Sequence, residues 1–156
     1  MKLIPVTLAL PLALLLCAGS AFAQVTVKDP WVRATVPAQT STGAFMQITS
    51  AQDARLIEVR SPAAATVEVH QMAMSNNVMK MSAVDAIPLP AGKPVILGPG
   101  GYHVMMMELK GQVKAGDTVP LTLVIETKDK QRQNIEVKAI AQPLGSSGPM
   151  SGMKMN

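Results

Sequence analysis

Apolar and polar residues alternate in short runs along most of this chain, and turn-forming residues separate the runs every eight to twelve positions. Alternation with a period of two is typical of β-strands that bury one face. No stretch of ten or more residues shows a convincing helical period. The predicted strands are Val25–Arg33, Gly43–Thr49, Arg55–Val59, Thr66–Met74, Val78–Val84, Pro94–Leu97, Tyr102–Leu109, Val119–Glu126 and Gln131–Ala139.

Turn-forming sequences connect these strands, among them "SNN", "GPGG" and "KDKQ". Many short strands at even spacing are typical of an antiparallel β-sandwich or a small β-barrel. The sequence therefore predicts a single all-β domain.

Both ends of the chain differ from this pattern. Residues 1–23 have a basic start, an apolar centre and a final Ala21-Phe22-Ala23, which predicts a signal peptide cleaved after Ala23. Leu16 precedes Cys17 where lipoprotein signals usually carry a small residue, so cleavage is favoured over lipidation. Residues 24–143 form the predicted domain, and the Gly/Ser-rich residues 144–156 a disordered tail. We expect a monomeric periplasmic protein without a stable membrane anchor.

Composition excludes several function classes. Loss of the signal peptide removes the single cysteine, so disulfides, thiolate catalysis and a blue-copper site that needs a Cys ligand are not available. Basic residues are scattered and aromatic residues make up 3% of the chain, which argues against nucleic-acid binding. No phosphate loop, nucleophile elbow or His-carboxylate pairing indicates an enzyme.

The two histidines share a local pattern with methionine. His70 precedes Met72 and Met74 in its strand, and His103 precedes Met105 and Met107. Alternate residues of a strand share a face, so each histidine lies on the same face as two thioethers. The "SNN" turn makes a hairpin that can bring Met79 or Met81 close to the His70 strand.

These side chains can be interpreted in two ways. Methionine fills gaps in hydrophobic cores, and an isolated histidine is commonly a hydrogen-bonded or surface residue. Thioethers are also soft, neutral donors that suit Cu(I), whereas Zn(II) prefers imidazole, thiolate and carboxylate. Seven methionines lie in the two histidine-containing segments, which favours a soft-metal site.

The full spacing is more specific. His70, Met81, His103 and Met105 are separated by ten, twenty-one and one residues. This resembles the H-x10-M-x21-H-x-M motif of the periplasmic copper chaperone family PCu(A)C. The segment "DPWVRATVPAQTSTGAFMQITS" is also similar to that family's first block, and the resemblance covers residues 24 to about 142.

The resemblance implies a cupredoxin-like Greek-key β-barrel that binds one Cu(I) through His70, Met81, His103 and Met105. It also implies delivery of copper to the dinuclear copper site of cytochrome c oxidase, with subunit II or an assembly factor as the partner. Copper sequestration for resistance is the alternative, because it uses the same donors. The resemblance assigns no role to five other methionines, which are either core residues or alternative sulfur ligands: Met72, Met74, Met79, Met106 and Met107.

The tail departs from relatives that extend the C-terminus with both histidine and methionine. Here it holds Met150, Met153 and Met155 but no histidine. We expect at most weak Cu(I) capture by these methionines, because Cu(II) prefers imidazole nitrogen.

Overall fold

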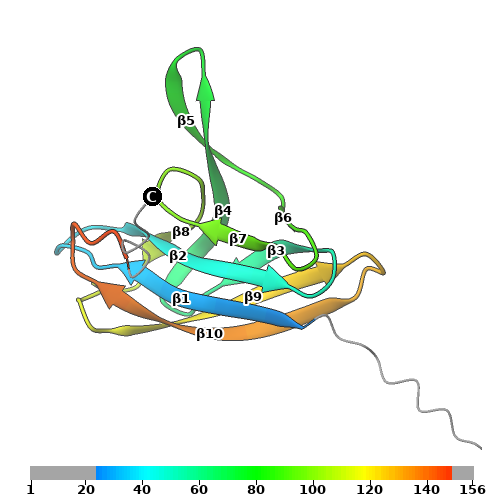
Figure 1. Ribbon diagram of the computed structural model, residues 1–156. Helices are drawn as coiled ribbons and strands as arrows, with labels where there is room; N and C mark the ends of the chain where they lie inside the picture. The colour runs from blue at the N-terminus through cyan, green and yellow to red at the C-terminus, as the bar shows by residue number, and fades with distance from the viewer. Residues whose placement is uncertain (1–23, 149–156) are drawn as a thin grey trace, which may run out of the picture.

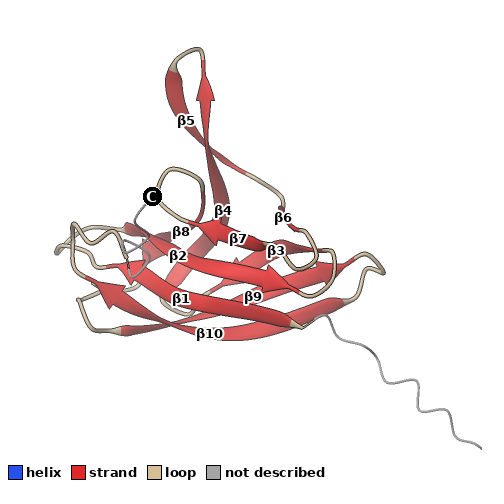
Figure 2. Cartoon of the chain, in the orientation of Figure 1, coloured by secondary structure: helices blue, strands red, loops and turns tan. Residues whose placement is uncertain are grey.

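The computed structural model describes residues 24–148 and contains ten strands and no helix in that range (Figures 1 and 2). Within this range, accordingly, no helix is long and apolar enough to cross a membrane. The strands are β1 Val25–Arg33, β2 Ser41–Ser50, β3 Ala54–Arg60, β4 Ala64–Ser75, β5 Val78–Ala83, β6 Ile87–Leu89, β7 Pro94–Leu97, β8 Tyr102–Leu109, β9 Thr118–Thr127 and β10 Arg132–Gln142.

Alternation in the sequence therefore predicts the secondary structure well. All nine expected strands are present, and three of them, β1, β7 and β8, have the predicted ends. The tenth strand, β6, was missed because Ile87–Leu89 has only three residues and contains Pro88. The signal peptide predicted over residues 1–23 lies outside the described residues.

The strands form one sheet in the order β5-β4-β8-β7-β2-β1-β10-β9-β3-β6. Most neighbours are antiparallel, but β1 pairs with β10 and β7 pairs with β8 in parallel. The first half of β2 pairs with β8 and the second half pairs with β7. The outer part of the β4–β5 hairpin stands away from the body of the domain (Figure 1).

One hydrophobic core joins the two halves of the sheet. Met46 of β2, Leu56 of β3, Val104 of β8 and Leu121 of β9 are each 0% exposed and belong to the same packed cluster. Burial of apolar side chains from both halves is the main stabilising term, since each large side chain contributes about 1.5–3 kcal/mol. The expected single all-β domain is confirmed.

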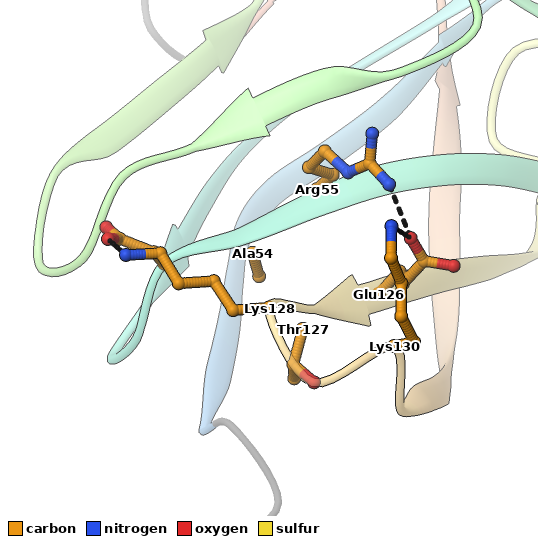
Figure 3. Close-up of a pocket in the computed structure, with 7 residues that line it drawn as sticks. Ala54, Arg55, Glu126, Thr127, Lys128 and Lys130 are labelled. Carbon is orange, nitrogen blue, oxygen red and sulfur yellow. Dashed lines mark hydrogen bonds and ion pairs between the residues drawn. The ribbon is translucent and has the colours of Figure 1, made fainter.

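The buried carboxylate of Glu126 links the three neighbouring strands β3, β9 and β10. Glu126 of β9 receives an Arg55 hydrogen bond from β3 and lies 3.3 Å from Nε of Arg132 in β10. Nζ of Lys130 lies 3.6 Å from Oε1 of Glu126, and the nearby Lys128 forms an ion pair with Asp53 (Figure 3). The Arg55 hydrogen bond, followed by that of Arg132, lowers the pKa of Glu126 against the opposing effect of desolvation. The surrounding cavity of about 310 Å³ thus has its charged groups paired with one another.

We predict that Glu126→Gln destabilises the protein at neutral pH. Because the pKa of Glu126 is lowered in the folded state, its stabilising effect is present above the ordinary glutamate value of 4.5 and is lost as pH falls through the folded value. Urea unfolding should show a difference in the free energy of unfolding between wild type and variant that shrinks as the pH falls below 4.5. Glu136→Gln is the matched control, because the Glu136 carboxylate accepts hydrogen bonds from the Thr122 hydroxyl and forms no ion pair among residues 24–148. An equal loss in both variants would contradict this role.

Candidate metal centre

The pairing of β4 with β8 places the two histidines side by side. His70 lies opposite His103 in the antiparallel register, and their ring centroids are 5.7 Å apart. The residues that alternate with them, Val69 and Val104, point into the hydrophobic core. The histidines therefore occupy the outer face of the sheet, although each is only 8% exposed.

Thioether side chains from three strands lie on the same face. Met72 pairs with Met81 across β4 and β5, two positions beyond His70. Met105 lies two positions beyond His103 on β8, opposite Glu68, and Met107 follows it, opposite Thr66. Thus β4, β5 and β8 bring imidazole and thioether groups into one continuous patch.

A cavity of about 320 Å³ opens on this patch. Its lining includes His103 and the three methionines Met72, Met81 and Met105, but not Met74, Met79 or Met107. Residues of β1 and β2 and of the loops that precede β2 and β8 complete the wall. The alternation of residues along a strand could not choose between Met79 and Met81 or between Met105 and Met107. In the structure, Met81 and Met105 line the cavity, whereas Met79 and Met107 do not.

One carbonyl oxygen fixes the orientation of His103. The ring Nδ1 lies 3.2 Å from the Gly101 oxygen, which can only accept a hydrogen bond. Nδ1 of His103 therefore carries a proton, and in the neutral ring Nε2 keeps the lone pair that a metal needs.

A carboxylate fixes the orientation of His70 in the opposite way. Nε2 of His70 lies 2.8 Å from Oε2 of Glu68, so Nε2 donates, and in the neutral ring Nδ1 keeps the lone pair. Nδ1 is buried and has no hydrogen-bond partner among residues 24–148. A buried lone pair without a partner is costly, and a bound cation would satisfy it.

An aromatic wall shields His103 from solvent. The Phe45 ring centroid lies 6.4 Å from that of His103 and 4.4 Å from that of Trp31. Phe45 can lie over Gly43 because glycine has no side chain, and a Cβ there would be 2.7 Å from the ring. The wall lowers water access around the imidazole, which strengthens its interaction with a cation.

The donor set on this face is unsuited to hard ions. Residues 24–148 contain no group of three or more His, Cys, Asp or Glu side chains placed to hold a metal. Two imidazoles with several thioethers instead suit a soft monovalent ion such as Cu(I). The fit to a soft ion therefore depends on methionine sulfur.

The methionines outside the cavity differ in how far they are exposed to solvent. Met106 is 0% exposed in the core, whereas Met74 and Met79 are 65% and 47% exposed on the outer part of the hairpin. The tail methionines lie outside the described residues, but Gly148 lies against the Trp31 ring. Sequence reasoning did not identify Glu68, Gly101 or Phe45, because their importance depends on strand register rather than on a motif.

Comparison with known proteins agrees with this architecture. The profile of the LpqE-like family, described as candidate lipoproteins, matches residues 25–138. Lxx21020 of Leifsonia xyli, also named as a candidate lipoprotein, is 31% identical over 100 residues. That match covers 64% of this chain and 60% of the Leifsonia protein, so the chain accounts for less than two thirds of that relative.

Solved structures with similar folds include copper-binding domains. The copper-bound PCuAC domain from PmoF2 is 25% identical, with a TM-score of 0.62 over 76% of this chain and 92% of the domain. The Cu(I) form of DR1885 from Deinococcus radiodurans is 30% identical, with a TM-score of 0.53 over 81% of this chain and 82% of that protein.

The expected cupredoxin-like architecture is therefore confirmed, and the resemblance drawn from the spacing of His70, Met81, His103 and Met105 leads to the same group of proteins. This chain belongs to the LpqE-like family and has the fold of the PCuAC domains.

Proposed function

We propose that the protein is a periplasmic Cu(I) chaperone that binds one ion through His70, Met81, His103 and Met105. The ion would be cargo, delivered to the dinuclear copper site of cytochrome c oxidase through subunit II or an assembly factor. The observation that carries the proposal is the convergence of two imidazoles and several thioethers on one face of β4, β5 and β8.

The local geometry supports binding to a soft ion. Gly101 and Glu68 leave His103 Nε2 and His70 Nδ1 as the available nitrogens, and both rings belong to the same cross-strand pair. Thioethers need no deprotonation before they bind, so the soft donors stay available in an oxidising compartment that would oxidise paired thiols.

Uneven exposure of the donors supports reversible binding. The histidines are nearly buried, whereas Met81 is 50% exposed on the projecting hairpin. An exposed, neutral thioether can be replaced by a ligand of the recipient while the buried imidazoles still hold the ion. Exchange of this kind suits delivery better than permanent storage.

Export is part of the proposal. Residues 1–23 have the composition of a signal peptide, and the related Leifsonia protein is named as a candidate lipoprotein. We infer cleavage after Ala23, a domain over residues 24–143 and a tail over residues 144–156.

We predict that the exported protein, residues 24–156, binds one equivalent of Cu(I) tightly and binds Zn(II) negligibly. His103→Ala and Met81→Ala should each weaken Cu(I) binding by at least about tenfold, because each removes a donor. Anaerobic titration against a chromophoric Cu(I) chelator measures the affinity.

Met79→Ala is the matched control for Met81→Ala. Met79 lies on the same strand with 47% exposure, similar to the 50% of Met81, but does not line the cavity. The control should bind Cu(I) like wild type. Equal affinity for Zn(II) and Cu(I), or an equal loss in both methionine variants, would contradict the proposed site.

Delivery and sequestration predict different cellular phenotypes. If the protein delivers copper, deletion of its gene should lower cytochrome c oxidase activity, and added copper should restore it. If the protein sequesters copper, deletion should instead cause copper sensitivity with normal oxidase activity. Oxidase assays of the deletion strain across copper concentrations distinguish the two roles, and only the first agrees with our proposal.

A further inference from the structure

We propose that Met72 is a further copper-binding residue, a sulfur donor outside the four-residue motif. The inference rests on the proposed Cu(I) site and extends its ligand set. Three features carry it: the cross-strand position of Met72, the backbone hydrogen bond that holds it, and its place in the cavity.

The first feature is the register of the β4–β5 hairpin. Met72 lies directly opposite Met81, and Val69 marks the alternate, core-facing set of β4. Directly opposed residues have Cβ atoms about 5 Å apart, and thioether side chains are long and flexible. The two sulfur atoms can therefore reach one ion together.

The second feature is the hydrogen bond at Gly101. The Met72 amide donates to the Gly101 oxygen at 3.1 Å, and the His103 ring donates to the same oxygen at 3.2 Å. One carbonyl group thus holds the backbone of Met72 and orients the imidazole of His103. The shared carbonyl therefore holds the backbone of Met72 next to the ring of His103.

The third feature is the composition of the cavity. Met72, Met81, Met105 and His103 line it, whereas His70 does not and remains hydrogen-bonded to Glu68. The cavity therefore presents one imidazole and three thioethers to an entering ion. Extra sulfur favours Cu(I) over metals that prefer nitrogen or oxygen.

These positions suggest how the ion is passed between donors. His70 and Met72 are neighbours on one strand face, and Met72 faces the exposed Met81. An ion held first by the cavity sulfurs and His103 can gain His70 Nδ1 without leaving the patch. Met72 then links the exposed donor of the hairpin to the buried pair of histidines.

Methionine-methyl NMR tests this assignment, because Cu(I) is diamagnetic. The exported protein is labelled with ¹³C at the methionine methyl groups, and each signal is assigned by a Met→Leu substitution. One equivalent of Cu(I) should shift the methyl signals of Met72, Met81 and Met105 and leave that of Met74 unchanged. Met74 is the control because it lies on the same face of β4 but is 65% exposed and outside the cavity.

Affinity measurements complete the test. Met72→Leu, which keeps the side-chain volume but removes sulfur, should weaken Cu(I) binding by at least about tenfold, and Met74→Leu should change it less than about twofold. If Met81 and Met105 shift while Met72 does not, and Met72→Leu binds like Met74→Leu, the assignment of Met72 is wrong and the four-residue site stands. If none of the three signals shifts, the proposed function itself fails.

Discussion

The pairing register of β4 with β8 is the constraint on which the proposed metal-binding face depends. In this register His70 opposes His103, while Val69 and Val104 on the other face join the core. A slip by one residue would turn every side chain of a strand to the opposite face, burying imidazole and exposing valine. Core packing therefore holds these side chains in place, and the same burial that stabilises the domain also aligns the proposed soft ligands.

Outside the core, short polar contacts refine the positions of the donors. The Gly101 oxygen orients His103 and anchors Met72, and Glu68 orients His70. These partners select opposite nitrogens of the two rings, so both lone pairs remain available. The aromatic residues Phe45 and Trp31 shield one side, while the hairpin leaves Met81 exposed. Nearly buried nitrogen donors next to an exposed thioether are well suited to the proposed cycle of holding an ion and then releasing it.

Much of this architecture could be predicted from the sequence. Period-two alternation located nine strands because each buries one face, and parity placed His70 with Met72 and His103 with Met105. Alternation could not give the order of strands, the parallel pairings of β1 and β7, or the short β6, because these depend on long-range contacts. Glu68 and Gly101 likewise gain their roles only when β4 and β8 meet.

X-ray absorption spectroscopy of the copper-loaded protein tests the central claim most directly, because it reports the oxidation state and the atoms bound to the metal. Our account predicts Cu(I) with both imidazole nitrogen and at least two sulfur scatterers in its first shell. Residues 24–156 contain no cysteine, so in a protein of these residues any sulfur scatterer must be a methionine thioether. A first shell of nitrogen and oxygen alone would contradict the account, because the methionines of β4, β5 and β8 would then not bind the ion.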